Sequence, residues 1–340
     1  MKHVFRKLAF VFLTMVLIFS SSLYPAVAHT TASAGNPYAE TDPLTLWYYN
    51  YETGESYEEA LETSQSLYAA AAQIVQTRPA YCPPNISNAL ESGVETRGVP
   101  TDQSTVRAHS YPYCAAGKLE LYIDEDNDGD VDIDRDNPAA EGTAFLVAED
   151  IILTAAHCIY QPSGTAKRAY FYPAQQNDSD SYCETYGTYI VASLMSTAYR
   201  DSQDLSQDWA ICQIAHNRGD TFGWFGLSSS AGVYTGLSLT ALGYPGNEVG
   251  RPAVVEECQY KSPGTVSSIL STMRFKTTNY VQGGYSGGPL YDSNGLVYGI
   301  ISMAEDSLDY GTTNTIAIQF PTYLYNKIIE YCDASEARWS

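Results

Sequence analysis

Short apolar runs, separated by Gly, Pro, Asn and Ser, fill the chain after Arg97. Examples of the runs that predict strands are 119–123, 144–147, 151–154, 169–172, 189–194, 209–214, 237–242, 296–302 and 315–319. Many short strands between turn signals favour an all-β sandwich or a pair of barrels over alternating βα units. Apolar residues at helical spacing predict one closing helix over 321–332.

The stretch 29–97 has a different pattern. Apolar and small residues at helical spacing predict a helix over 57–76, with glutamates at the N-terminal end, where the helix dipole favours them. Pro79 follows the pattern and would end such a helix. We therefore expect a partly helical segment ahead of the β-rich region.

The first residues have the pattern of a secretory signal peptide. Lys2, Arg6 and Lys7 precede the apolar run 8–19, and small residues then predict cleavage after Ala28. The apolar run is shorter than the roughly 20 residues that span a bilayer, which argues against the alternative of a retained anchor. We expect a secreted, extracellular protein with no membrane attachment after cleavage.

Composition narrows the function classes. The chain has 340 residues, 39 acidic and 18 basic side chains and a formal net charge of -21. A chain this acidic repels phosphate backbones, so we expect no nucleic-acid partner. The seven cysteines fit an oxidising destination and predict disulfide bonds, although six of them already allow 15 pairings.

Three short pieces hold the residue types of nucleophilic catalysis: 153–158, 207–211 and 283–289. A serine hydroxyl, Ser286, needs a base to take its proton, and His157 can act as that base if a carboxylate such as Asp208 fixes its tautomer. Glycines around Ser286 can turn the Gly284 and Ser286 N–H groups toward one oxyanion. Asp201 and Asp204 are alternatives to Asp208.

In this order, the His, Asp and Ser motifs resemble the chymotrypsin-like serine peptidase family, and within it the secreted bacterial glutamyl endopeptidases. The shared sequence motifs include 111–113, 154–160, 208–211, 223–226, 243–246 and the Ser286 loop. The resemblance implies an all-β fold of two six-stranded antiparallel β-barrels with the triad between them, followed by the C-terminal helix. It also implies a serine endopeptidase that acts through an acyl-enzyme on protein or peptide substrates and requires no cofactor.

The resemblance also implies a division of the chain. We expect a signal peptide over 1–28, a propeptide over 29–97 and a trypsin-like serine peptidase domain over 98–340. A cut after Arg97 would release the mature domain, and Arg107 is a second candidate. The propeptide is expected to bind the peptidase domain. Because both segments are acidic, we do not expect this binding to come from simple opposite charge. The mature protein is expected to be a monomer. Until it is cut, the chain is expected to be a zymogen.

Two departures from the family concern cysteine and activation. Relatives bridge the cysteine after the catalytic histidine to one about sixteen residues before it, a position held here by Gly142. Cys158 then pairs elsewhere, for which Cys183 is our expectation, or stays free. Tyr285 stands before the nucleophile, where the animal peptidases have an aspartate that receives the new N-terminus.

Specificity is a third departure. Glu-preferring relatives use a His after the nucleophile and a Thr or Ser before it, and the matching positions here are Ile301 and Val281. An apolar pair offers no donor to a substrate carboxylate, so we expect an apolar or aromatic P1 residue. Ser302 lies where the family's strand backbone pairs with the substrate.

An acidic stretch over 124–134 has two interpretations. Asp124, Asp126, Asp128 and Asp130 alternate as in a calcium loop, but Arg135 stands where a bidentate carboxylate is expected. The other interpretation is a solvated hairpin tip. A structural calcium ion therefore stays open, and with it one rival function, a calcium-binding scaffold. A separate rival, independent of calcium, is a non-catalytic binding module on the same fold.

Overall fold

The computed structural model describes residues 44–61, 74–88, 101–102, 109–122, 138–161, 164–165, 168–176, 185–247, 253–255, 257–305 and 314–340. The predicted signal peptide, the acidic stretch 124–134, Cys183, Arg97 and Arg107 lie outside these residues. No described helix is long and apolar enough to cross a membrane.

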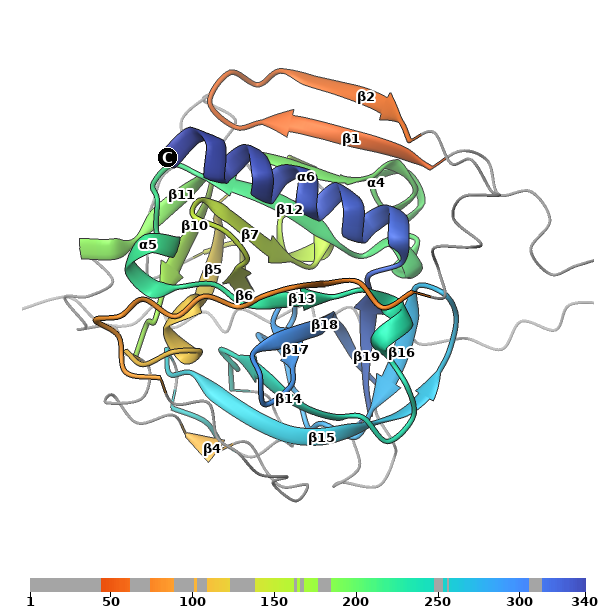
Figure 1. The fold of residues 1–340 in the computed structure, drawn as a ribbon. Coiled ribbons are helices and arrows are strands. Elements are labelled where there is room, and N and C mark those ends of the chain that lie inside the picture. The colour runs from red at the N-terminus through yellow and green to blue at the C-terminus, as the bar shows by residue number, and fades with distance from the viewer. Residues whose placement is uncertain are drawn as a thin grey trace, which may run out of the picture. The chain divides into compact units, whose positions relative to one another are not determined.

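The first barrel is a closed sheet in the order β10-β5-β6-β7-β12-β11, in which β10 also pairs with β11 (Figure 1). Its strands are β5 (Ala116–Tyr122), β6 (Ala140–Leu146), β7 (Ile151–Thr154), β10 (Arg168–Pro173), β11 (Thr188–Ser196) and β12 (Ala210–Ile214). The sequence predicted a run within or overlapping each of these strands.

The second barrel closes in the order β17-β14-β15-β16-β19-β18, with β17 pairing to β18. Its strands are β14 (Ser238–Gly243), β15 (Tyr260–Ile269), β16 (Arg274–Thr277), β17 (Pro289–Tyr291), β18 (Leu296–Glu305) and β19 (Asn314–Gln319). The short strand β13 (Gly226–Ser228) runs parallel to β18 and β4 (Thr101–Asp102) pairs with β15. The expected pair of six-stranded antiparallel barrels is therefore confirmed.

Helices are few. The closing helix α6 (Thr322–Trp339) is longer than predicted and packs on the first barrel, where Leu324, Ile328 and Cys332 are buried. The remaining short elements are α4 (Thr197–Ser202), α5 (Gly219–Phe222), η1 (Tyr113–Ala115), η2 (Ala156–Cys158), η3 (Leu205–Gln207), η4 (Ser230–Gly232), β8 (Tyr160–Gln161) and β9 (Gly164–Thr165).

The segment before the β-rich region is itself β-structured where it is described. Strands β1 (Thr45–Asn50) and β2 (Ser56–Ala60) form a hairpin on β11, and β3 (Thr77–Arg78) pairs with β13. The helix predicted over 57–76 is wrong at its beginning, because Tyr57 stacks on Tyr48 across the hairpin at 4.6 Å between ring centroids. Cross-strand aromatic pairing overrides helical spacing here.

Cysteines make no bridge among the described residues. Cys82, Cys114, Cys158, Cys212 and Cys332 are free thiols. The predicted disulfide bonds are therefore not confirmed in the described part of the chain. Gly142 explains the state of Cys158: a β-carbon on Gly142 would lie 2.7 Å from the Cys158 Sγ, so the thiol occupies the space above the glycine.

Candidate active site

Strand pairing in the first barrel brings His157 and Asp208 together. β7 and β12 pair with Thr154 opposite Ala210, so the residues just after β7 and just before β12 lie side by side. His157 is in η2 and Asp208 follows η3. The sequence places both residues in loops at one end of adjacent strands.

Asp208 accepts hydrogen bonds from two groups of His157. The His157 Nδ1 lies 2.8 Å from the Asp208 Oδ2, and the His157 backbone N–H donates to Oδ1 at 3.0 Å. Because a carboxylate only accepts, the Nδ1 carries a proton and the Nε2 is left as the basic nitrogen. Asp201 is instead paired with Arg200, and Asp204 caps η3.

Ser302 of the second barrel completes the support of Asp208. Its hydroxyl donates to the Asp208 Oδ2 at 2.5 Å, and the Asp208 side chain is 1% exposed. Sequence reasoning assigned only the Ser302 backbone a role, so this side-chain contact was missed. Nothing near either residue in the sequence signals it, since the two belong to different barrels.

The charges of the pair are mutually stabilising. Burial raises the pKa of Asp208, but the His157 charge and the hydrogen bonds from His157 and Ser302 outweigh it and hold that pKa below its usual range. Burial lowers the pKa of His157, whereas the Asp208 carboxylate and then Cys158 raise it well above 6.5. The His157 side chain is 33% exposed, so its ring can meet a substrate.

The loop that carries Ser286 lies between β16 and β17 of the second barrel, and Thr143 of β6 holds it. The Thr143 hydroxyl donates to the Gly284 carbonyl at 2.7 Å, and the Thr143 N–H donates to the Ser286 carbonyl at 2.8 Å. The Cys158 thiol reaches the same Ser286 carbonyl at 3.5 Å. Thr143 is a second residue that sequence reasoning missed. These contacts bring the Ser286 loop to the barrel that holds His157.

Two glycines of this loop are required by its geometry. Gly284 has φ +94° and Gly287 φ +82°, and a β-carbon at either would lie 2.1 Å from a backbone carbonyl oxygen. In the described structure, neither the Gly284 nor the Ser286 N–H donates to another backbone carbonyl. Both N–H groups therefore remain available to an oxyanion.

The residues predicted to set specificity are buried. Val281 and Ile301 are each 1% exposed and belong to the core cluster of the second barrel, together with Tyr285. Tyr285 is fully buried, and burial raises its pKa well above 10. The tyrosine before the nucleophile is thus a core residue, with its ring against the place where Gly243 lacks a side chain.

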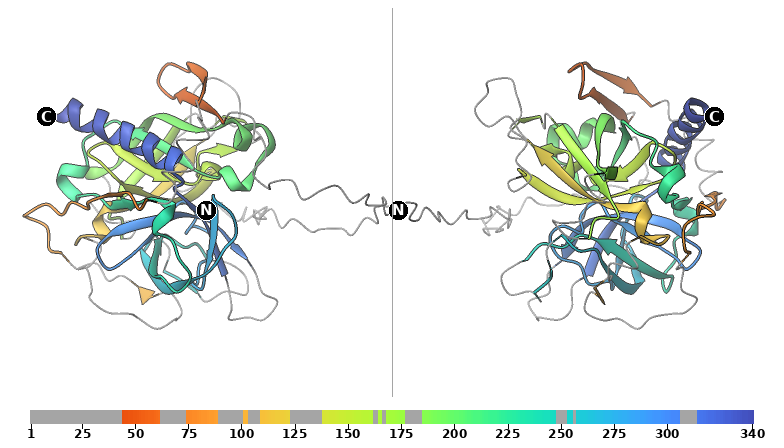
Figure 2. Two further views of the ribbon diagram at one scale, coloured as in Figure 1. Left: turned by 45° about the vertical axis from the view of Figure 1, so that its right-hand side comes forward. Right: turned by 90° about the vertical axis from the view of Figure 1, so that its left-hand side faces the viewer.

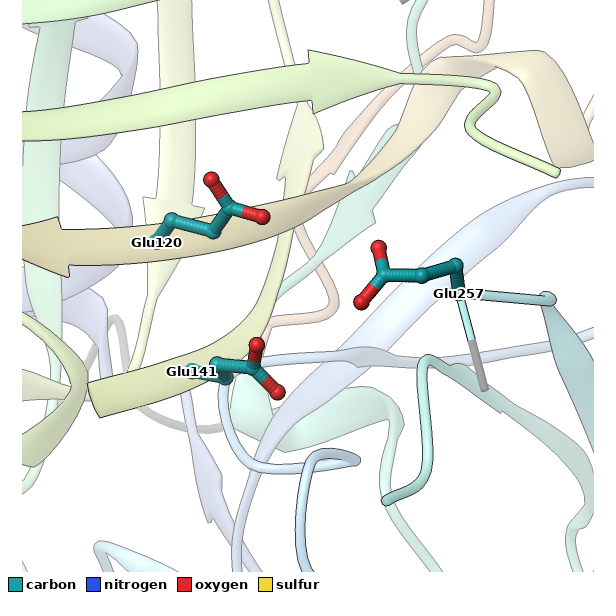
Figure 3. Close-up of side chains that lie close together, drawn as sticks. All are labelled: Glu120, Glu141 and Glu257. Atoms are coloured by element: carbon teal, nitrogen blue, oxygen red, sulfur yellow. The ribbon is translucent and has the colours of Figure 1, made fainter. Parts of the chain in front are cut away.

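A second charged cluster lies at the junction of the barrels. Figure 3 shows the side chains of Glu120, Glu141 and Glu257 lying close together. One carboxylate oxygen from each lies within 4.8 Å of the other two. The Lys118 ammonium is already among them, at 3.1 Å from Glu120 and 2.8 Å from Glu141, and it also bonds Glu257. The lysine supplies the positive charge at this position, so the cluster is an ion-pair network rather than a metal centre.

The fold and the sequence place the chain in a known class. Residues 142–300 match the family model of the trypsin-like peptidase domain. This match and the double-barrel fold support a trypsin-like peptidase domain, and with it a serine endopeptidase.

Two curated relatives are similar over much of the chain. It is 24% identical to the glutamyl endopeptidase of Bacillus licheniformis (strain ATCC 14580) over 290 residues, which covers 80% of this chain and 79% of that protein. It is 26% identical over 194 residues to an extracellular metalloprotease of Bacillus subtilis (strain 168), covering 56% of this chain and 54% of that protein, so it spans about half of that relative's length.

Solved structures agree on the fold. A Glu endopeptidase in complex with MPD superposes with a TM-score of 0.53 at 20% identity, covering 71% of this chain and 99% of its own. The protease Anisep from Arthrobacter nicotinovorans superposes with a TM-score of 0.50 at 18% identity, covering 66% of this chain and 96% of its own. At these identities the likeness defines the double barrel alone.

Proposed function

We propose that the chain hydrolyses peptide bonds with Ser286 as nucleophile, His157 as general base and acid, and Asp208 as the group that orients His157. The observation that carries this proposal is the Asp208 carboxylate, which is buried yet accepts hydrogen bonds from His157 and Ser302. Such a carboxylate fixes one histidine tautomer and stabilises the imidazolium that forms during acyl transfer.

The steps follow from these positions. The Ser286 oxygen attacks the substrate carbonyl carbon while its proton passes to the His157 Nε2, and the Gly284 and Ser286 N–H groups hold the negative oxygen. His157 then gives the proton to the departing amine, which leaves an ester on Ser286. A water molecule attacks this ester with the same base, and the acid product and the free hydroxyl result. This chemistry uses no cofactor.

For substrates, we propose proteins or peptides with an apolar or aromatic P1 residue. Val281 and Ile301 lie in an apolar cluster and offer no hydrogen-bond donor to an acidic side chain. The relative from Bacillus licheniformis is named a glutamyl endopeptidase, so a glutamyl preference is the competing outcome. A peptide library cleaved mainly after Glu would contradict the apolar preference and leave the triad untouched.

We propose an extracellular location with removal of residues 1–28 and a later cut after Arg97. The n-region, apolar run and small residues near Ala28 support the first, and the name of the Bacillus subtilis relative, an extracellular protease, is consistent with it. N-terminal sequencing of protein from culture medium tests both cuts. A mature N-terminus far from Gly98 would overturn the second.

Labelling with a fluorophosphonate tests the triad. The secreted protein is expected to react. The Ser286→Ala variant, once circular dichroism has verified that it is folded, is expected not to react. A folded wild-type protein that fails to label would instead favour a non-catalytic binding module on this fold. Labelling that persists in Ser286→Ala would mean that another nucleophile is active.

A further inference from the structure

The part of the chain ahead of the proposed cut is built into both barrels. We call residues 45–60 the N-terminal hairpin and residues 74–88 the N-terminal strap. Figure 2 shows the hairpin over the first barrel in both views. We propose that hairpin and strap stay bound after the chain is cut between Asn88 and Thr101, and that the hairpin supports the loop that carries His157.

The hairpin covers an edge that barrel closure leaves open. β11 closes the barrel by pairing with β10 only at Thr188 and Tyr189. Beyond that point β1 is the strand on this side, in register from Asn50 opposite Ala192 to Leu46 opposite Ser196. An uncovered edge of this length would present unpaired N–H and C=O groups to water and to other chains. Removing the hairpin therefore exposes backbone, which favours its retention.

Side chains of both strands fasten the open end of the hairpin, where Leu46 stands opposite Glu59 and Trp47 opposite Glu58. Leu46 is 1% and Trp47 9% exposed, so both are core residues of the first barrel. Glu58 pairs with Arg200 of α4 and Glu59 with Lys327 of α6, each at 2.8 Å. These local pairs explain how an acidic segment docks on an acidic domain. The net charges of the two segments predicted no attraction between them. The basic side chains of the domain nevertheless lie opposite the hairpin glutamates and pair with them.

The strap is held by the second barrel. β3 pairs with β13, and Tyr81 and Trp224 exchange two backbone hydrogen bonds of 3.0 Å. The guanidinium of Arg78 lies 5.5 Å from the centre of the Trp224 ring and also donates to the Val147 carbonyl. A cation over an indole face adds to the backbone pairing.

The conspicuous stretch 223–226 gains a role from this contact. A β-carbon on Gly223 would lie 2.2 Å from the Tyr81 carbonyl oxygen, and one on Gly226 would lie 2.6 Å from the Arg78 carbonyl oxygen. The two glycines permit the backbones to approach. A sequence motif of the peptidase domain is thus shaped to receive the segment that precedes it.

The hairpin also reaches the catalytic histidine loop. The Trp47 ring packs edge-on against Tyr160, with 5.7 Å between centroids, and Tyr160 is three residues beyond His157. The guanidinium of Arg200 lies over the Trp47 ring, 5.5 Å from its centroid. Tyr199, the residue before Arg200, is buried near Asp208. Burial raises the pKa of Tyr199, and the Asp208 carboxylate raises it further. Trp47 is therefore a positioning residue for the His157 loop.

Retention is tested on the full chain, with a specific protease site inserted between Arg97 and Gly98 and with Ser286→Ala to prevent self-digestion. After folding and cutting, gel filtration and mass spectrometry are run with and without reductant. The reductant is included because Cys82 of the strap lies near Cys114 of the domain, where it adds to the effect of burial in raising the pKa of the Cys114 thiol. Both fragments are expected in one peak, in equal amounts, in either condition. Loss of the N-terminal fragment, or its retention only without reductant, overturns the proposal.

Support of the His157 loop is tested by Trp47→Ala, with Tyr57→Ala as the matched control, since Tyr57 is 53% exposed on the outer strand. Trp47→Ala is expected to lower kcat about tenfold at nearly unchanged KM and to move the acid limb of the pH profile. Trp47→Phe is expected to restore most of both, and Tyr57→Ala to change neither. Equal kinetics for Trp47→Ala and wild type overturns the support role.

The activity readout rests on the proposed function, and the retention readout does not. If the wild-type chain, cut after Arg97, fails to react with a fluorophosphonate, the proposed function fails. Retention measured on the Ser286→Ala chain still decides whether hairpin and strap stay bound.

Discussion

Two ionic clusters join the same pair of barrels, and they are built in opposite ways. At one, His157 and Asp208 of the first barrel meet Ser302 of the second. At the other, Lys118 and two glutamates of the first barrel meet Glu257, which precedes β15 of the second. The first pairs one acid with one base, whereas the second places three acids around one base.

The difference distinguishes a cluster that can exchange a proton with a substrate from a fastening, a cluster that only joins the two barrels. The Asp208 side chain is 1% exposed but its partner is 33% exposed, so the basic nitrogen of His157 can exchange a proton with a substrate. Lys118 is only 4% exposed at its side chain, and its ammonium is surrounded by carboxylates that raise its pKa against the effect of burial. Its proton is held in place, so this cluster can join the barrels but cannot transfer protons.

The largest expected effect comes from Asp208→Asn. The amide preserves shape but offers a donor where His157 needs an acceptor, which favours the wrong tautomer. We expect kcat to fall by about 10³- to 10⁴-fold, with a much smaller change in thermal stability. Asp201→Asn, an exposed neighbour, is the control and is expected to change kcat by less than about twofold. A kcat for Asp208→Asn within tenfold of wild type would contradict the assigned role.

Lys118→Met tests the other cluster. It leaves three carboxylates facing one another without a cation, so we expect a loss of about 3–5 kcal/mol in the free energy of unfolding, measured with denaturant. Lys276→Met removes an exposed pair with Glu305 and is expected to cost less than about 1 kcal/mol. If the two variants lose similar stability, the Lys118 network is not a fastening.

Most of the fold could be predicted from the sequence, because the barrel strands are short apolar runs between turns. β15, β16 and β17 contain none of the predicted runs. In β15, Pro263 and Gly264 interrupt the strand, and both residues are usually signs against one. The N-terminal hairpin was missed for another reason. Tyr57, Ala60 and Leu61 fit helical spacing, and only the distant partner β11 decides that the backbone is extended.

The site divides in the same way. His157, Asp208 and Ser286 stand in local motifs, so sequence alone could nominate them. Thr143 and Ser302 act across the junction of the barrels, and no spacing in the sequence encodes that contact. Lys118 and Glu120 alternate on β5, which places them on one face, but the approach of Glu257 is again a property of the folded chain.

Ser302→Ala is expected to have a smaller effect than Asp208→Asn, because the carboxylate keeps its two bonds from His157. A lost hydrogen bond to a charged group is worth about 1.5–3 kcal/mol, so kcat should fall by about ten- to a hundredfold. Ser267→Ala removes a hydroxyl on an exposed part of β15 and serves as the control. Unchanged kcat in Ser302→Ala would mean that Asp208 needs no support from the second barrel.

The pH dependence of kcat/KM gives the finest separation of the two clusters. His157 must be neutral at Nε2 to accept the Ser286 proton, so activity rises with pH as the imidazolium loses its proton. Since Asp208 raises the pKa of His157 above 6.5, the acid limb of the wild-type profile is expected above that pH. In Asp208→Asn the carboxylate no longer raises the pKa of His157, whereas burial still lowers it, so the limb is expected to move to lower pH. Lys118→Met, measured where it is folded, is expected to leave the limb in place, because its charges face Glu120, Glu141 and Glu257 rather than His157. A limb that moves with Lys118→Met and stays with Asp208→Asn would exchange the roles of the two clusters.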